Sequence, residues 1–169
     1  IAAAQEERFT RIKHDNSFPS NSIIYCLKEA KITAKDLSHV VFYEKPFLKF
    51  ERVIQTFLDY APRGWLQFVS AIPGWLKEKL FIKKNIKEAI EEFGEINWKT
   101  TPLLFSKHHL SHAASTFYPS NFSEAAILTI DGVGEWATAS ISVGKENKIQ
   151  ALKELQFPNS LGLLYSAFT

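Results

Sequence analysis

Two histidines and an aspartate within residues 106–136 could act together in chemistry. His108 and His112 are four residues apart, so on a helix their side chains lie on one face. Asp131 directly follows the apolar run 126–130, which has the composition of a strand. Two imidazole nitrogens and a carboxylate oxygen suit a divalent metal and leave coordination positions for substrate or water. We therefore predict His108, His112 and Asp131 as metal ligands.

Other residues of this stretch have two interpretations each. A histidine pair with this spacing also arises by chance, and His109 is expected to lie on a different face, as a structural residue or as a hydrogen-bonding partner of a neighbour. Gly132 and Gly134 predict a turn that lets backbone N–H groups approach a phosphate, and the same residues suit an ordinary hairpin. Glu135 either contacts a nucleotide or metal-bound water, or only caps the turn.

The run QEERFTRIKHD, residues 5–15, mixes both charges tightly. It can be a solvated loop, or a phosphate clamp, because arginine and lysine both bind phosphate oxygens. In the second case Arg11 and Lys13 are the residues expected near the anion. Glu6 and Arg8 could equally form a structural ion pair.

The spacing of apolar and turn residues predicts the surrounding elements. Ser20, Ser22 and Ser160 are candidate helix N-caps. A strand at 39–43 is expected to be buried, because its sequence HVVFY is almost wholly apolar. The remaining expected elements are a helix over 22–31, a capped turn over 33–37, a strand over 102–105, the histidine-bearing helix, strands over 126–130, 137–143 and 149–157, and a final helix after Ser160.

Residues 45–98 differ in character from the rest of the chain. Their apolar residues recur at helical intervals, which predicts two or three helices, with breaks near 62–64 and 73–74. We interpret this segment as a helical insertion beside the central sheet. Its tryptophans and lysines could also suggest contact with a membrane surface, although helices that cover the sheet or a partner domain are the favoured interpretation.

Composition limits the classes of function. A chain of 169 residues with 46% apolar residues can build one globular core, and a net charge of +2 is too small to indicate a nucleic-acid partner. Cys26 is the single cysteine, which excludes an intramolecular disulfide and is compatible with a cytoplasmic protein. The uncharged apolar stretch 64–76 contains a proline and is too short to span a membrane, so no membrane partner is expected either.

Three motifs occur in the chain order AAAQEERFTRIKHD, HHLSHAASTFYPSNFSEAAILTIDGVGEWATASI and FPNSLGLLYSAFT. Together they resemble the O-carbamoyltransferase family, which includes nodulation-factor and antibiotic carbamoyltransferases. The resemblance covers most of the chain and is weakest over residues 45–98. It implies an α/β fold of the actin-like, ribonuclease-H-like (ASKHA) type, with a mixed sheet and flanking helices.

This resemblance also implies an activity. Carbamoyl phosphate and ATP would give a carbamoyl adenylate, whose carbamoyl group passes to a hydroxyl of an acceptor. The implied metal is iron, while zinc or manganese would also suit nitrogen and oxygen ligands. Residues 1–169 are expected to be a fragment of the N-terminal carbamoyltransferase domain, inactive by itself. The expected partners are the remaining domains, one of which supplies a further acidic ligand, and a homo-oligomer stays open.

Three rival functions remain at this stage. A tRNA threonylcarbamoyl-transfer enzyme shares the histidine motif, but the sequences EERFTRIKHD and DGVGEW favour the O-carbamoyltransferase. A zinc hydrolase is disfavoured because SKHHLSH lacks a glutamate beside the first histidine to act as base. A non-catalytic scaffold of the same fold would explain the aromatic-rich segment and predicts no metal or nucleotide binding.

Overall fold

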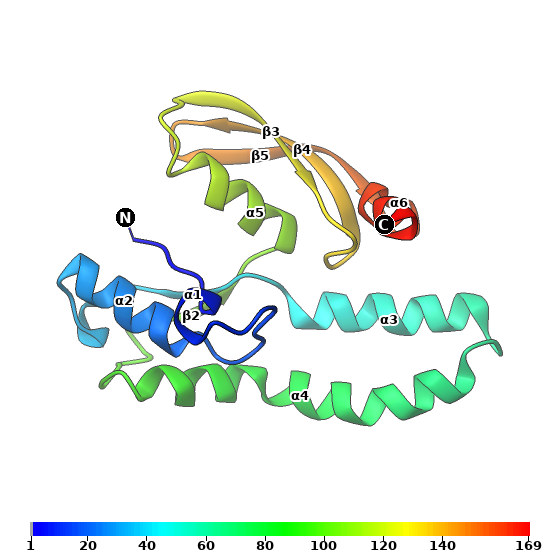
Figure 1. Cartoon of the computed structure of the whole chain (residues 1–169), viewed down its shortest axis with the longest axis horizontal. Coiled ribbons are helices and arrows are strands. Elements are labelled where there is room, and N and C mark those ends of the chain that lie inside the picture. The colour runs from blue at the N-terminus through cyan, green and yellow to red at the C-terminus, as the bar shows by residue number, and fades with distance from the viewer. Residues whose placement is uncertain (1) are drawn as a thin grey trace. The chain divides into compact units, whose positions relative to one another are not determined.

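The structure is a computed structural model that describes residues 2–169, apart from the side chains of residues 67, 71 and 75–80. It is a mixed α/β arrangement of helices and two small sheets (Figure 1). The elements are α1 (Glu7–Thr10), α2 (Ser20–Ala30), the 3-10 turn η1 (Ala34–Asp36), β1 (Val40–Phe42), α3 (Pro46–Tyr60), α4 (Trp65–Glu91), β2 (Leu103–Phe105), α5 (His108–Phe117), β3 (Glu124–Ile130), β4 (Ala137–Lys145), β5 (Lys148–Gln156) and α6 (Leu161–Phe168).

The chain forms two compact units. The first contains the residues up to Val40 together with Leu80–Leu104, and the second contains Val41–Lys79 and Phe105–Thr169. All the residues predicted to bind metal belong to the second unit, whereas the charged run at residues 5–15 belongs to the first.

In the first unit, a carboxylate from a distant segment caps helix α2. Oε1 of Glu6 accepts a hydrogen bond from the N–H of Asn21 at 3.2 Å, and Oε2 accepts one from the N–H of Ser22 at 2.9 Å. Glu6 therefore satisfies backbone donors at the start of the helix, where serine caps were expected. The prediction of Ser20 or Ser22 as N-cap is wrong, because Pro19 holds that position and no side chain of its own caps the helix.

The turn after α2 agrees with the sequence prediction. Thr33 and Asp36 form a capping box around η1, in which the Asp36 carboxylate accepts from the N–H of Thr33 at 2.8 Å. The next prediction, a buried strand at 39–43, is wrong in its burial. β1 contains only three residues, and successive side chains point to opposite faces, which leaves Val41 59% exposed.

Strands β1 and β2 form a two-stranded parallel sheet. The N–H of Val40 donates to the Pro102 carbonyl, and the N–H of Ser106 donates to the Phe42 carbonyl, so the pairing advances in the same direction along both strands.

Helices α3 and α4 occupy most of the segment interpreted as an insertion. The break predicted near 62–64 separates them, and the Phe57 ring stacks on Phe68 with 3.9 Å between ring centroids. The break predicted at 73–74 is wrong, because α4 continues through Pro73. A proline removes one backbone hydrogen bond, and the helical turns on both sides keep theirs. The interpretation as an insertion stays a prediction.

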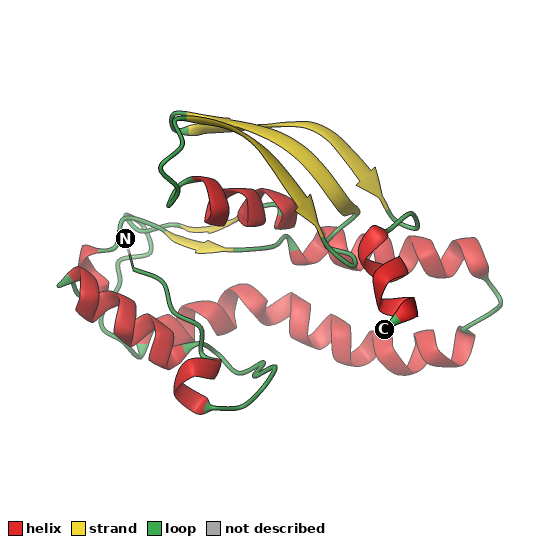
Figure 2. Cartoon of the chain, turned by 45° about the horizontal axis from the view of Figure 1, so that its top comes forward, coloured by secondary structure: helices red, strands yellow, loops and turns green. Residues whose placement is uncertain are grey.

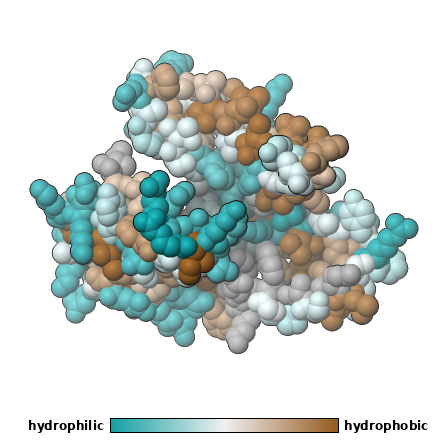
Figure 3. Space-filling view, in the orientation of Figure 1, coloured by the Kyte–Doolittle hydropathy of each residue, from teal (hydrophilic) through white to brown (hydrophobic). Residues whose placement is uncertain are grey.

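The second unit is organised around the antiparallel sheet β3-β4-β5, with α5 packed on one face (Figure 2). Strands β3 and β4 alternate in burial, so Ile127 of β3 joins Ala113 and Phe117 of α5 in the core. The opposite face exposes apolar side chains such as Leu128 and Ile141, and hydrophobic surface is visible over this part of the molecule (Figure 3).

No helix among the described residues is both long enough and apolar enough to cross a lipid bilayer.

Candidate functional site

The first turns of α5 and the end of β3 bring the three predicted metal ligands together. Nε2 of His108 lies 2.7 Å from Oδ2 of Asp131 and 3.1 Å from Nε2 of His112. Nε2 of His112 lies 3.9 Å from the same Asp131 oxygen. The helix thus presents both imidazoles on one face, as their spacing predicted, and that face meets the carboxylate at the end of the neighbouring strand.

The donor set fits a divalent metal ion. Ligand atoms bonded to one such ion at about 2.0–2.2 Å lie roughly 3–3.5 Å from each other, close to the separations in this group. The ligand atoms all lie within 4.8 Å of one another. The His112 side chain is 53% exposed, so the group is open on one side, where a substrate oxygen or water could complete the coordination. His108, His112 and Asp131 are therefore the residues that would hold the metal.

Local hydrogen bonds keep the Asp131 carboxylate ionised and oriented. Burial by itself would raise the pKa of Asp131, but the N–H of Gly132 and the His108 imidazole lower it, and the net shift is downward. The Gly132 N–H donates to Oδ1 at 2.7 Å, which leaves Oδ2 directed at the histidines. The carboxylate is thus an anion at neutral pH, the form that binds a metal.

The turn between β3 and β4 packs directly against the His108 ring. A Cβ atom at Gly134 would lie only 2.7 Å from Cδ2 of that ring, so glycine is required there by the close approach. The Gly134 N–H donates to the Ala137 carbonyl, and the Gly132 N–H binds Asp131. Both amides therefore serve the turn itself, and phosphate binding by Gly132 and Gly134 stays a prediction.

The start of helix α6 fastens the other side of this turn. The Ser160 hydroxyl donates to the Gly132 carbonyl at 2.6 Å and accepts from the N–H of Leu163, so the predicted N-cap also holds the site. The backbone of Gly162 approaches so closely that a Cβ atom there would lie 2.3 Å from the Asp131 carbonyl oxygen. Sequence reasoning did not single out Gly162.

Glu135 is buried, at 5% exposure, and acts outside its own turn. Its Oε1 accepts a hydrogen bond from the N–H of Lys45, the residue before helix α3, at 2.5 Å. The side chain therefore connects the β3–β4 turn with the start of α3, a role that neither sequence interpretation included.

A second buried carboxylate, Glu44, was missed by sequence reasoning. It is 2% exposed, and its Oε2 lies 3.1 Å from Nζ of Lys49 and 3.8 Å from Nδ1 of His108. One sequence signal was present, because Glu44 is a charged residue directly after an apolar strand. Charged side chains at the ends of strands often contribute to functional sites.

His109 faces away from the two predicted ligands, as expected. It is 5% exposed, and its Nδ1 lies 3.1 Å from the Ser140 hydroxyl of β4. Burial, followed by the neighbouring His108, lowers the pKa of His109, so the ring is neutral at physiological pH. It connects the helix to the sheet.

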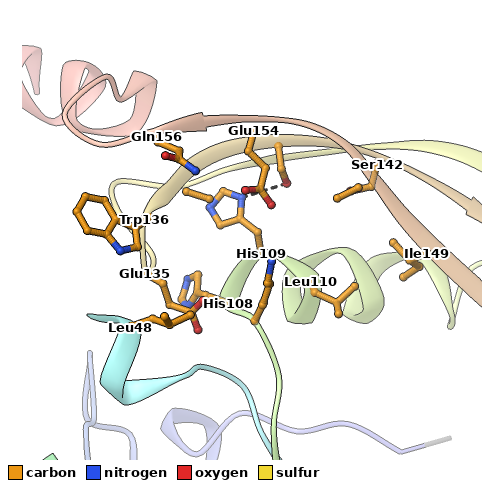
Figure 4. A pocket seen from close by; sticks show the side chains of 14 residues that line it. Leu48, His108, His109, Leu110, Glu135, Trp136, Ser142, Ile149, Glu154 and Gln156 are labelled. Atoms are coloured by element: carbon orange, nitrogen blue, oxygen red, sulfur yellow. Dashed lines mark hydrogen bonds between the residues drawn. The ribbon is translucent and has the colours of Figure 1, made fainter. Parts of the chain in front are cut away.

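A cleft of about 580 Å³ lies beside this group, between α5 and strands β4 and β5 (Figure 4). Its wall combines imidazole, carboxyl, hydroxyl and indole groups with apolar side chains, a mixture typical of sites for small organic ligands. The polar and aromatic lining residues include His108, His109, Glu135, Trp136, Ser140 and Glu154.

Arg11 and Lys13 are exposed residues of the first unit. Arg11 ends helix α1 in a left-handed conformation, with φ of 62°. Their predicted contact with a phosphate stays a prediction. The alternative prediction was an ion pair between Glu6 and Arg8. In the structure the Glu6 carboxylate instead caps α2.

The chain is similar over its whole length to known proteins. The family model described as "Carbamoyltransferase N-terminus" matches residues 1–169. Protein sll1178 of Synechocystis is 55% identical over 170 residues, which cover 100% of the chain and 28% of that protein. The nodulation protein NolNO of Sinorhizobium fredii is 36% identical over 166 residues, covering 98% of the chain and 22% of that protein. The chain thus spans about a quarter of the length of these relatives.

Proposed function

The chain belongs to the carbamoyltransferase family, whose N-terminal model spans it completely, and from this premise we propose that the complete polypeptide is an ATP-dependent O-carbamoyltransferase. Water would hydrolyse carbamoyl phosphate to carbamate and inorganic phosphate, and a carbamate oxygen would then attack the α-phosphorus of ATP, breaking its bond to pyrophosphate, which is released. An acceptor hydroxyl would then attack the carbonyl carbon of the carbamoyl adenylate, lose its proton and release AMP. The acceptor is proposed only as a compound that carries a hydroxyl.

One observation carries this proposal: His108, His112 and Asp131 meet at one point on the edge of a cleft. A divalent ion bound there would supply positive charge for phosphate or carbonyl oxygens. Iron is our first choice and zinc or manganese are compatible, because the ligands are nitrogen and oxygen atoms. The negatively charged carboxylate of Asp131 would bind the metal ion, and the two imidazoles would fix the position of the ion relative to the cleft.

The wider architecture supports an actin-like, ribonuclease-H-like fold as part of the same proposal. Three antiparallel strands joined by tight turns and followed by a helix resemble the opening of an actin-like half-domain, in which the first turn faces nucleotide phosphates. Here that turn contains Gly132 and Gly134 and begins at Asp131. ATP is therefore proposed to bind with its phosphates toward the metal group.

The proposal can be tested by pyrophosphate release from ATP in the full-length protein, with and without carbamoyl phosphate and before any acceptor is added. We expect release that requires carbamoyl phosphate and that falls to background in His112→Ala. His39→Ala is the matched control, because His39 is an exposed histidine of the first unit. It should retain wild-type release.

Three results would change the assignment. Release without any dependence on carbamoyl phosphate would contradict carbamoyl-adenylate chemistry. A requirement for tRNA as acceptor would indicate a threonylcarbamoyl-type transfer. Absence of both metal and nucleotide binding would leave a scaffold role for the domain.

A further inference from the structure

We propose that Glu44 is a positioning residue that fixes the tautomer and orientation of His108, so that Nε2 is the metal-binding atom. The inference rests on the proposed metal centre, and it adds a residue from outside the histidine motif. Glu44 lies between strand β1 and helix α3, 64 residues before His108. Its carboxylate is almost fully buried, at 2% exposure, and a buried charge needs partners that offset the free-energy cost of its desolvation.

Two cationic or proton-bearing groups converge on one oxygen of Glu44. Nζ of Lys49 lies 3.1 Å from Oε2, and Nδ1 of His108 lies 3.8 Å from the same atom. The His108 nitrogen is buried and has no hydrogen-bond partner among the described residues. The Glu44 carboxylate thus faces Nδ1 from beyond hydrogen-bonding distance, where the attraction between the two groups is electrostatic.

The opposite side of the ring faces the metal group. Nε2 of His108 lies 2.7 Å from Asp131 Oδ2 and 3.1 Å from His112 Nε2. A neutral imidazole carries one N–H and one lone pair, and a metal ligand must present the lone pair. With Nε2 as the ligand atom, the proton is on Nδ1, where the negative charge of Glu44 favours it. Outer carboxylates act in this way on many metal-binding histidines.

The backbone on both sides of Glu44 is fastened to the elements that carry the ligands. The Ser111 hydroxyl of α5 donates to the Tyr43 carbonyl at 2.8 Å, and the Lys45 N–H donates to Glu135 in the β3–β4 turn. Ser111 lies one helical turn after His108, so Glu44 and the imidazole are held against each other from both directions. The carboxylate is therefore built into the site.

The test measures metal affinity in the full-length protein, independently of turnover. Metal-free protein would be titrated with Co²⁺, and binding would be monitored by the visible absorption of the bound ion. A second titration would measure Zn²⁺ affinity by competition with a chromophoric chelator. Glu44→Gln keeps the size of the side chain and removes its charge, and Glu44→Ala removes the group. We expect Glu44→Gln to weaken binding by about 10- to 100-fold and to change the Co²⁺ spectrum.

Two controls separate positioning from folding and from the metal assignment itself. Asp36→Asn makes a similar carboxyl-to-amide change in the capping box of η1 and should leave affinity and spectrum unchanged. His112→Ala removes a proposed ligand and should abolish binding. The thermal unfolding of each metal-free variant shows whether that variant is folded. If Glu44→Ala does not fold, the metal affinity of Glu44→Gln tests the role of Glu44.

The outcomes are distinguishable. Wild-type affinity and an unchanged spectrum in folded Glu44→Gln and Glu44→Ala, with binding lost in His112→Ala, would overturn the role of Glu44 alone. Failure of the wild-type protein to bind either ion would overturn the metal centre and the positioning role together. Carbamoyl-phosphate-dependent pyrophosphate release is measured separately, so loss of that activity with intact metal binding would reject only the proposed reaction.

Discussion

Nδ1 of His109 lies 3.1 Å from the Ser140 hydroxyl, so the middle histidine of the motif is bound to β4 while its two neighbours face Asp131. The contact between His109 and the sheet therefore fixes the rotation of α5, and with it the face that presents His108 and His112. The neutral state of buried His109 suits this structural role.

Ser140→Ala should destabilise the domain and affect metal binding only weakly. The change leaves a buried imidazole nitrogen without its partner, which costs about 1–3 kcal/mol. Chemical denaturation of the full-length protein measures the loss of unfolding free energy, read from the transition in which this domain unfolds. An unchanged transition would show that the His109–Ser140 contact contributes nothing to stability.

Gly134→Ala should disturb the metal group directly. The new Cβ atom would lie 2.7 Å from Cδ2 of His108, so the ring or the turn must move, at a cost of about 1–3 kcal/mol. Metal affinity should fall with stability. Gly74→Ala is the matched control, because no atom of the described residues lies within 4 Å of its added atom and alanine favours the helix by about 1 kcal/mol. Equal effects of both changes would contradict the packing of the turn against His108.

Glu6 predicts a specific dependence of stability on pH. Burial acts to raise its pKa, but hydrogen bonds from Ser22 and Asn21 prevail and lower the pKa below its ordinary value of 4.5. A carboxyl group with a lowered folded-state pKa stabilises the fold above its unfolded pKa, and this contribution is lost as pH falls through the folded value. The wild-type protein should therefore exceed Glu6→Gln in stability near neutral pH.

Denaturation of both proteins at a series of pH values checks this expectation. The difference in free energy of unfolding should be constant at neutral pH and should shrink once pH falls below about 4.5, the ordinary pKa of the group. A difference that stays constant down to pH 3, or that grows in acid, would contradict the capping role of Glu6.

The sequence was most informative where neighbouring residues decide the structure. The face shared by His108 and His112, the capping box at Thr33 and Asp36, and the N-cap at Ser160 each depend on residues within one helical turn. The position of Asp131 at the end of a strand follows from the apolar run before it.

Contacts between distant segments could not be predicted in the same way. Glu44 reaches His108 from 64 positions earlier, and Glu6 caps a helix that begins 14 residues later. Nothing in a short sequence window distinguishes such a carboxylate from a solvated one. Burial of β1 was overestimated for a related reason, because an apolar strand is buried on both faces only where other layers cover it.

The metal content of purified full-length protein tests the central proposal most directly. Wild-type protein and His39→Ala should each retain one divalent ion per polypeptide after dialysis, measured by elemental analysis, whereas His112→Ala and Asp131→Asn should lose it. This result would place the ion at the group formed by α5 and the end of β3. Equal metal content in all four proteins, or none in the wild-type protein, would contradict a metal centre at His108, His112 and Asp131.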